Sequence, residues 1–473
     1  MNPLHRRACR TRQRHARIRD HRGMRAPATT EEPAVSGPFA LTNATIVTGD
    51  ADGTVLPERT IVVAGGGEIE QVGPAAETPV PAGYRAVDTT GRFVVPGLVN
   101  AHAHLFSDGR PLPPILLNES AQGLVSVFSR SPLGRLLFTR RTRTNVTTQL
   151  HSGVTTIRSV GDVAYEVVAV ANEIDRGKYV GPRVLASGPL LAVTGGHGAP
   201  QIALTSDSPW EARRNTRRNV RHGVKAIKIS ATSGVTDARS IGQAGRPEMT
   251  EEEMTAICAE AHNAGLLVAA HAQGKDGILA SLRAGADTIE HGAGMTSEII
   301  DLFRENPRSL NGTSALVPTL QAALPLVKLD RKVTGISDIS RANAVMILDE
   351  MLQGIRDAQD NGVAIGMGTD SALTFVPHYD AWREMDFLVR YGGLTPAQTL
   401  NAATRTNAKI LGLDGVTGSI EPGKAADLVV LGSNPLDGFR ALVDPQMVIT
   451  RGTVIDHPSV TRYPDIDAVL DSI

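Results

Sequence analysis

The middle of the chain alternates short apolar runs with longer segments of helical periodicity. This alternation is typical of consecutive βα units, in which helices connect parallel strands. One helix is well delimited, because Thr250 is a candidate N-cap with Glu253 three residues later, and Gly265 follows as a stop. Eight apolar runs are predicted strands: Phe93–Asn100, Val154–Val160, Arg183–Gly188, Lys225–Ser230, Leu266–Ala270, Thr288–Glu290, Ala315–Leu320 and Val363–Met367.

Eight strands with crossover helices predict an α/β fold, a closed (β/α)8 TIM barrel, with a doubly wound open sheet as the alternative. Both chain ends carry shorter strand-like runs separated by Gly, Asp and Pro turn signals. We therefore expect residues 38–92 and 420–473 to form a small β-sandwich domain around a barrel that spans 93–419. The runs at the two ends are Ala40–Thr48, Thr60–Ala64, Glu68–Val72, Asp427–Leu431, Gln446–Thr450 and Gly452–Ile455.

The composition limits the classes of possible binding partner more than it limits the possible folds. The 473 residues are 41% hydrophobic and 21% charged, as in an ordinary globular protein. The net charge of −1 gives no overall field that would attract nucleic acid or an acidic membrane, and no apolar stretch is long enough to span a bilayer. The two cysteines, Cys9 and Cys258, suggest no disulfide framework. We expect a cytoplasmic protein that binds neither nucleic acid nor a membrane.

The first residues differ from the rest of the chain. An arginine-dense stretch is followed by a Pro/Ala/Glu-rich one, and no apolar run follows the basic residues, which excludes a secretory or twin-arginine signal. We expect residues 1–37 to be a disordered basic tail, or to include residues upstream of a true start at Met24. A basic arm that binds nucleic acid is the alternative.

Polar residues follow directly after five of the predicted barrel strands. His102 and His104 end the first one, and residues two apart in a strand face the same side, so both imidazoles can point into one site. Lys228 lies in the apolar run KAIKIS, where an inward lysine is costly unless it is paired, neutralised or modified. Any one of these residues alone has an ordinary structural explanation, such as a hydrogen-bonded turn. Together, the ends of strands one, four, five, six and eight carry His102, His104, Lys228, His271, His291 and Asp370, where barrel enzymes build active sites.

These residues lie in segments that resemble the motif set of the amidohydrolase superfamily. The segments are Val95–His104, Ile227–Ile229, His271–Ala272, Glu290–Gly292 and Gly368–Asp370, and Gly418–Val430 is similar to the stretch that leads this family back into its β-sandwich. The resemblance covers about Ala40 to Ile455. It is closest to the branch that contains imidazolonepropionase-like proteins and metal-dependent Xaa-Pro and related carboxydipeptidases.

Two departures from the family pattern bear on the site. Asn100 stands where the family usually has Asp, at a position that is not a ligand. Ala231–Val235 replaces the Ser-Gly-Gly run that those dipeptidases tend to carry after the lysine. Because that loop touches substrate, the second departure leaves the substrate open.

The resemblance implies two divalent metal ions bridged by a carboxylated Lys228. A carbamate is anionic and has two oxygens, which suits it to bridge two cations. Imidazole and carboxylate ligands suit zinc, which we expect first, and also cobalt or manganese. A water between the ions would lose its proton and attack the substrate carbonyl, and Asp370 would pass that proton to the leaving nitrogen. By this resemblance His102, His104 and Asp370 hold the buried metal, and His271 and His291 hold the other.

The resemblance implies a hydrolase that cleaves a C–N amide bond, in a dipeptide such as Xaa-Pro or in an N-acyl amino acid. A carbamate, a urea or a cyclic amide, as in imidazolonepropionase-like proteins, is the alternative. The mononuclear deaminase branch usually has Glu three residues after the strand-five histidine, where this chain has Gly274, and it lacks the bridging lysine. A non-catalytic metal-binding barrel would be expected to lose ligands, and all six are present.

Three loop residues are candidates for binding substrate. His197 lies in a Gly-rich turn after strand three, Arg239 follows strand four, and His378 follows Asp370. Asp162 and Gln321 are predicted to face the same end of the barrel, and neither has an assigned role. By analogy with the family we expect a small-molecule substrate and a homo-oligomer.

Overall fold

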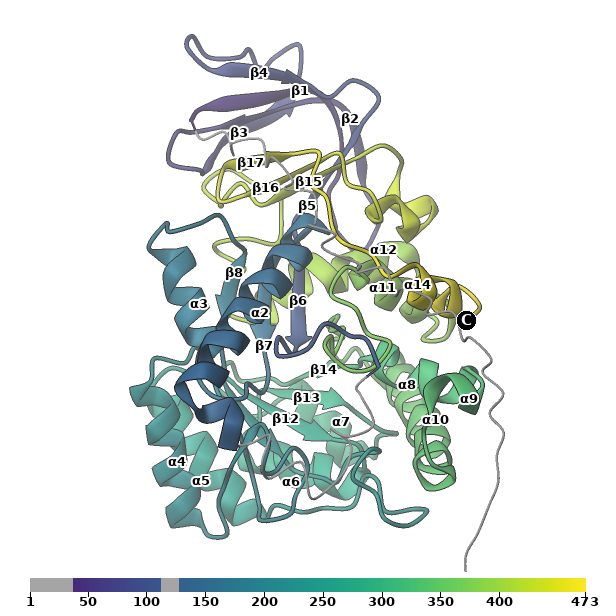
Figure 1. The fold of residues 1–473 in the computed structure, drawn as a ribbon. Coiled ribbons are helices and arrows are strands. Elements are labelled where there is room, and N and C mark those ends of the chain that lie inside the picture. Colours follow the sequence, from purple (N-terminus) through teal and green to yellow (C-terminus); the bar gives the residue numbers. More distant parts are fainter. Residues whose placement is uncertain (1–36, 112–126) are drawn as a thin grey trace, which may run out of the picture. The chain divides into compact units, whose positions relative to one another are not determined.

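Both ends of the chain contribute strands to one sheet. The computed structural model describes residues 37–111 and 127–473, so the predicted basic tail, except Gly37, lies outside the described residues, as does Cys9. The sheet order is β17-β16-β15-β5-β1-β2-β3, with β4 paired to β1 (Figure 1). Its strands are β1 (Phe39–Val47), β2 (Val55–Val63), β3 (Ile69–Pro74), β4 (Arg85–Asp88), β5 (Phe93–Pro96), β15 (Leu428–Leu431), β16 (Met447–Thr450) and β17 (Thr453–Asp456).

This terminal sheet has an apolar core of its own. Leu41 and Ile46 on β1 are buried with Ile61 on β2, and Val94 on β5 joins Leu428 on β15 in the same cluster. Branched and aromatic residues favour strands because they pack well on a pleated surface. The apolar cluster therefore joins the two distant parts of the chain.

The middle of the chain forms parallel strands, as the βα alternation predicts. Every strand pair in its two sheets is parallel. One sheet is β6 (Leu98–Ala103), β7 (Val154–Ser159) and β8 (Arg183–Leu185). The other has the order β10-β9-β11-β12-β13-β14, made by β9 (Leu190–Ala192), β10 (Ala203–Thr205), β11 (Ile227–Ser230), β12 (Val268–Ala272), β13 (Thr288–His291) and β14 (Ala315–Val317).

Helices separate most of these strands and pack on them through a large shared core. The capping box predicted for α5 is present: the Thr250 side chain accepts from the Glu253 amide, and the Glu253 carboxylate accepts from the Thr250 amide. Gly265 follows with φ +68°, a left-handed conformation suited to glycine. The helices between strands are α2 (Pro132–His151), α3 (Glu166–Asp175), α4 (Pro209–Arg221), α5 (Glu251–Asn263), α6 (Lys275–Ala284) and α7 (Ser297–Arg304).

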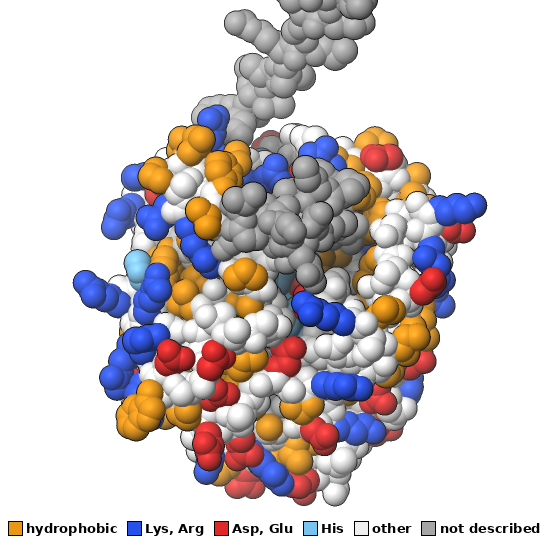
Figure 2. All heavy atoms as spheres, turned by 60° about the horizontal axis from the view of Figure 1, so that its bottom comes forward, with side chains coloured by type: hydrophobic (Ala, Val, Ile, Leu, Met, Phe, Trp, Pro, Cys, Tyr) orange, Lys and Arg blue, Asp and Glu red, His pale blue; other side chains and the backbone are white. Residues whose placement is uncertain are grey.

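The remaining helices lie between β14 and the terminal sheet or close the chain. They are α8 (Leu320–Lys328), α9 (Arg331–Thr334), α10 (Asp338–Asp360), α11 (Ala381–Arg390), α12 (Pro396–Asn401), α13 (Asn407–Ile410) and α14 (Pro464–Leu470). Among the described residues, none of the helices combines the length and apolar character of a membrane span. On the face shown in Figure 2, acidic and basic side chains are interspersed, in keeping with the net charge of −1.

The prediction of a regular strand at Val363–Met367 is wrong. The segment contacts β14 through the isolated parallel bridge between Leu316 and Ile365, and contacts β6 through the Ala101 amide, which donates to Met367 O at 3.0 Å. A Cβ on Gly368 would lie 2.5 Å from the His102 Cβ. Glycine is thus needed for this close approach. Within the segment, the Met367 amide donates to the Asn407 Oδ1 at 3.1 Å rather than to a neighbouring strand.

Two other predicted strands differ in extent. The run Phe93–Asn100 is divided at Gly97 into β5 and β6, and a Cβ on Gly97 would lie 2.2 Å from the Thr155 Oγ1. The run Arg183–Gly188 contains only the short β8, and β9 and β10 follow it. In both places a glycine turns the chain between two sheets.

Candidate metal centre

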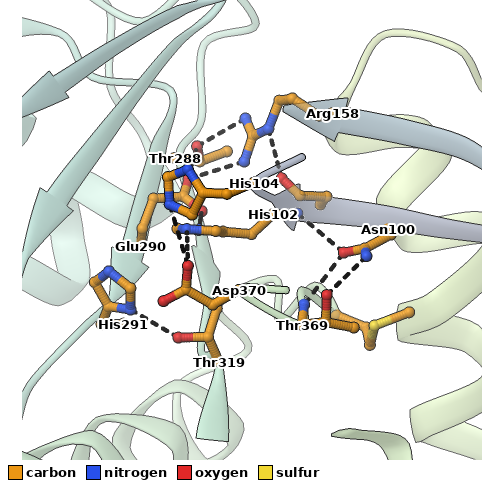
Figure 3. A network of polar contacts seen from close by, with 12 residues as sticks. Asn100, His102, His104, Arg158, Thr288, Glu290, His291, Thr319, Thr369 and Asp370 are labelled. Carbon is orange, nitrogen blue, oxygen red and sulfur yellow. Dashed lines mark hydrogen bonds and ion pairs between the residues drawn. The ribbon is translucent and has the colours of Figure 1, made fainter. Parts of the chain in front are cut away.

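Five of the six predicted ligands lie at or just beyond the carboxyl ends of the parallel segments, Lys228 lies within β11, and all six are buried. His102 lies one residue before the end of β6, and His291 is the last residue of β13 (Figure 3). His271 lies on β12. Their exposed fractions are 1% for His102, 8% for His104, 2% for Lys228, 3% for His271, 5% for His291 and 4% for Asp370.

The closest contacts of the centre join two histidines to one carboxylate oxygen. The Nε2 atoms of His102 and His104 each lie 3.2 Å from the Asp370 Oδ1. His102, His291 and Asp370 each offer a ligand atom, and these atoms lie within 4.8 Å of one another. The His271 ring lies 4.6 Å from the His291 ring, centroid to centroid. The structure thus brings the predicted histidines and aspartate to one place.

Lys228 faces the same centre from β11. Its Nζ is buried and has no hydrogen-bond partner. Burial lowers the pKa of Lys228 to about 8, although the carboxylates of Glu290 and Asp370 act in the opposite direction. The predicted inward orientation therefore agrees with the structure, whereas Lys225, three residues earlier, is exposed.

Hydrogen bonds at the Nδ1 atoms of His102 and His104 fix the orientation of these two rings toward Asp370. The His102 Nδ1 lies 2.5 Å from the Glu290 Oε2, and the His104 Nδ1 lies 2.9 Å from the Gly161 carbonyl oxygen. A carbonyl oxygen and an ionised carboxylate can only accept, so both Nδ1 atoms carry the hydrogen. Both Nε2 atoms then present lone pairs toward Asp370.

The His102 Nε2, the His104 Nε2 and the Asp370 Oδ1 present lone pairs toward one another, and this arrangement is suited to binding a cation. The Asp370 Oδ1 receives no hydrogen bond, and neither does the His271 Nε2, although buried polar atoms nearly always have partners. Two ligands of a tetrahedral zinc ion, each about 2.0–2.1 Å from it, lie about 3.3 Å apart. The 3.2 Å separations between Nε2 and Oδ1 match that spacing. The residues present therefore fit a divalent metal ion.

The backbone is unusual at two of these residues. His291 has φ +71° and Asp370 has φ +55°, in the left-handed region that residues other than glycine seldom adopt. Such conformations cost free energy and tend to persist at functional sites. They independently indicate that the positions of the His291 and Asp370 side chains are important for function.

Sequence reasoning did not assign roles to the residues behind the ligands. Glu290 contacts His102, and the fully buried Arg158 donates to Glu290 through Nη2 at 2.8 Å. The Thr319 Oγ1 lies 2.7 Å from the His291 Nδ1. Arg158 lies in the predicted strand Val154–Val160, so a charged residue inside a predicted barrel strand, a signal like that of Lys228, could have revealed it.

Asn100, the departure from the family pattern, joins β6 to the segment that carries Asp370. Its side chain donates to the Thr369 Oγ1 at 2.9 Å and accepts from the Thr369 amide at 3.2 Å. It also donates to the Gln149 side chain at 3.1 Å. Asn100 therefore supports the position of the neighbouring Asp370.

Of the three predicted substrate residues, His197 lies against the centre. Its ring stacks on His271 with centroids 4.1 Å apart, its Nδ1 is in close contact with the Asp237 carboxylate, and its amide donates to the Glu248 Oε2 at 2.9 Å. Burial alone would lower the pKa of His197, but Asp237 and then Glu248 raise it above its ordinary value. A Cβ on Gly234 would lie 2.4 Å from the His197 Nδ1, so this packing requires glycine there.

The other two predicted substrate residues are placed differently. His378 is buried, its Nε2 lies 2.7 Å from the Ser107 carbonyl oxygen, and its Nδ1 lies 3.1 Å from the Gln149 amide nitrogen. Both ring nitrogens are thus engaged by the protein, and burial lowers the pKa of His378 to about 4. Arg239 is exposed, and its amide donates to the Gln243 Oε1 at 2.7 Å.

The two polar residues without an assigned role also differ. Asp162 accepts from the Ser159 hydroxyl at 2.8 Å and from the Gly188 amide at 3.1 Å, which gives it a structural role. Gln321 is fully buried, and neither of its side-chain amide atoms has a hydrogen-bond partner.

Comparison with known proteins agrees with this arrangement. A crystal structure of a candidate prolidase from Bifidobacterium longum is 50% identical and has a TM-score of 0.83, covering 93% of this chain and 99% of that one. A crystal structure of a Xaa-Pro dipeptidase with bound methionine is 26% identical with a TM-score of 0.75, covering 89% and 100%. Ochratoxinase from Aspergillus niger is 27% identical over 401 residues, which are 79% of this chain and 78% of that protein.

The family model for the amidohydrolase family matches residues 93–455, which contain all six predicted ligands. The resemblance seen in the sequence motifs is therefore confirmed. The chain belongs to the amidohydrolase family and is a hydrolase that acts on carbon–nitrogen bonds.

Proposed function

We propose that this chain is a binuclear metal-dependent hydrolase that cleaves the amide C–N bond of a Xaa-Pro dipeptide or an N-acyl amino acid. The observation that carries the proposal is the pair of 3.2 Å contacts between the lone-pair nitrogens of His102 and His104 and the Asp370 Oδ1. The choice of substrate is supported by the 50% identity to a candidate prolidase over almost its whole length.

We assign the metal ligands as the family resemblance implies. His102, His104 and Asp370 would hold the buried ion, and His271 and His291 the second ion, with zinc as the first expectation. Lys228, carboxylated on Nζ, would bridge the two. Its buried nitrogen without a partner supports this assignment, because a carbamate would give that position two oxygen ligands.

The proposed fold follows from the same segments. The parallel strands would close into a (β/α)8 barrel, with residues 363–371 as the eighth segment. Hydrogen bonds on both sides of that segment support this, and the Lys225 amide, which donates to the Ala186 carbonyl oxygen at 2.7 Å, joins the two parallel sheets elsewhere. Residues 38–92 and 420–473 would form the β-sandwich domain around the barrel at 93–419.

Hydrolysis adds hydroxide to the carbonyl carbon and a proton to the leaving nitrogen. Divalent ions bound at this centre would make a water more acidic and polarise the scissile carbonyl. Asp370 then has the role of proton carrier. Because its Oδ1 faces the two histidines, Oδ2 is the oxygen that takes the proton from water and delivers it to the nitrogen as the C–N bond breaks.

The loop residues would bind the rest of the substrate. With its Nδ1 held by Asp237, His197 can donate from Nε2 to a substrate carbonyl or carboxylate beside His271. Arg239 would reach a carboxylate at the outer end of the substrate. The two engaged nitrogens of His378 favour a positioning role for that residue over direct contact with substrate.

The experiment combines metal analysis with a hydrolysis panel. The purified protein is expected to hold about two divalent ions per chain, and a chelator should abolish hydrolysis. The panel contains Xaa-Pro dipeptides, N-acyl amino acids, carbamates, ureas and lactams, with turnover expected for one of the first two classes. One ion or none per chain would contradict the binuclear centre. Turnover confined to carbamates, ureas or lactams would contradict the proposed substrate class.

A further inference from the structure

A chain of buried polar groups runs from β7 through β13 to the metal centre on β6. Arg158 on β7, Thr288 and Glu290 on β13, and His102 on β6 are at most 1% exposed. Thr288 and Glu290 are two residues apart in one strand, so their side chains point to the same side. Figure 3 shows the chain of contacts from Arg158 to Asp370.

Every nitrogen of the Arg158 guanidinium has an acceptor. Nε donates to the Ala101 carbonyl oxygen at 2.6 Å, Nη1 to the Thr288 Oγ1 at 3.0 Å, and Nη2 to the Glu290 Oε1 at 2.8 Å. The guanidinium thus has its orientation fixed by two different strands besides its own.

The two oxygens of Glu290 have separate partners. Oε1 accepts from Arg158 and from the Thr288 hydroxyl, which lies 2.5 Å away, whereas Oε2 faces the His102 Nδ1 at 2.5 Å. A carboxylate held at both oxygens cannot turn away from the histidine. A buried carboxylate also needs a compensating charge, and Arg158 supplies it.

His102 differs in this respect from His104 and His291. The His104 Nδ1 faces a neutral carbonyl oxygen and the His291 Nδ1 faces a hydroxyl, whereas the His102 Nδ1 faces a carboxylate. A carboxylate on one imidazole nitrogen fixes the tautomer and makes the other nitrogen a stronger metal donor. Of these three histidines, His102 is therefore the one whose Nε2 is made the strongest metal donor by its hydrogen-bond partner.

We propose that Arg158 and Glu290 are positioning residues that orient His102 and set the affinity of the buried metal site. This inference rests on the proposed metal centre. The competing explanation is that the pair only joins β7 to β13 and stabilises the fold without affecting the metal.

The test measures metal affinity rather than turnover. Metal-free protein is titrated with zinc or cobalt against a chromogenic chelator, and its thermal unfolding is followed in parallel. Glu290→Gln is expected to weaken the tighter site roughly 10- to 100-fold. Cobalt-loaded protein should also show an altered visible absorption spectrum, because the ligand field of His102 changes.

The matched control is Asp287→Asn. Asp287 is a buried carboxylate that precedes β13 and lies 2.9 Å from the His262 Nε2, so it forms a carboxylate–histidine pair away from the metal centre. Its substitution should lower the unfolding temperature and leave metal affinity within twofold of the unmodified protein. If Glu290→Gln gives this same pattern, the pair is only structural and the inference is wrong.

A milder variant keeps the inference testable if Glu290→Gln fails to fold. Thr288→Val removes the hydroxyl that donates to Glu290 and keeps the shape of the side chain. It is expected to weaken the tighter site about threefold, as partial loss of an outer hydrogen bond does. Unchanged affinity in Thr288→Val would contradict the inference. If the unmodified protein binds no divalent ion, the proposed metal centre itself fails.

Discussion

The two sides of the candidate site are built differently. The strand side, formed by His102, His104, Lys228 and Asp370, is almost fully buried, and its histidines have their second nitrogens held by groups from other elements. The loop side consists of His197, Asp237 and Arg239. The side chain of His197 is 26% exposed and that of Asp237 is 41% exposed.

This difference suggests a division of labour. Groups that carry the reaction must be held to fractions of an ångström, which buried strand ends can achieve. Groups that select the substrate lie on loops, where a change alters binding and leaves the reactive centre intact. Substitutions on the strand side should therefore reduce turnover or metal content, and substitutions on the loop side should alter KM.

The largest effect is expected for Asp370→Asn on the strand side. The amide cannot carry the proton to the leaving nitrogen, so kcat should fall roughly 10²- to 10⁴-fold. Circular dichroism should show an unchanged fold, and steady-state hydrolysis gives the rate. Near-normal turnover would exclude Asp370 as proton carrier.

A second substitution on the strand side should affect metal content. Lys228→Ala removes the proposed bridging group, so the number of ions per chain should fall from about two to one or fewer. Elemental analysis of dialysed protein measures it. Lys225→Ala is the matched control, because Lys225 lies three residues earlier and is exposed. Equal metal content in both variants would contradict the bridging role.

On the loop side, Asp237→Asn should raise KM. Loss of a charged hydrogen bond costs about 1.5–3 kcal/mol, so kcat/KM should fall roughly 10- to 150-fold. Metal content should not change. Gly234→Ala should act in the same direction, because its Cβ would meet the His197 ring. A loss of bound metal in either variant would contradict the division between the two sides.

The smallest effect concerns Glu384 on α11, which accepts from the amides of Leu320 and Gln321 at the start of α8. Burial raises the pKa of Glu384 from 4.5 to about 8. The folded state therefore favours the protonated carboxyl, and this contribution to stability is complete below pH 4.5 and is lost as pH rises through 8.

Glu384→Gln should remove this dependence. In metal-free protein, the unfolding temperature of the unmodified chain should fall relative to that of the variant between about pH 5 and pH 8. Thermal melts of both proteins at several pH values give the comparison. If the two curves run parallel, Glu384 does not titrate in this range.

Much of the strand side could be predicted from the sequence. The two-residue spacing of His102 and His104, and the lysine in an apolar run, follow from strand periodicity alone. Arg158 and Glu290 were harder, because their role depends on three strands being side by side. The irregular course of Val363–Met367 and the close approach of Gly368 to His102 depend on tertiary contacts, which periodicity does not report.

The loop side could be predicted only in part. The position of His197 after a strand indicated a role near the site, but its partner Asp237 is 40 residues away in another loop. His378 occupies a comparable place in the chain, yet both of its nitrogens are used within the protein. Sequence position gives the neighbourhood of a loop residue, and the direction of its side chain depends on tertiary contacts.

The junction at Gly97 has a consequence for protein engineering. β5 belongs to the terminal sheet, and after the single residue Gly97 the chain continues as β6, which contains His102. β5 is paired along its length with β15, more than 300 positions downstream. Shortening the chain to remove β15 and the strands after it would leave β5 held only by its short pairing with β1, next to a catalytic strand, so this enzyme is not expected to tolerate reduction to a minimal catalytic fragment.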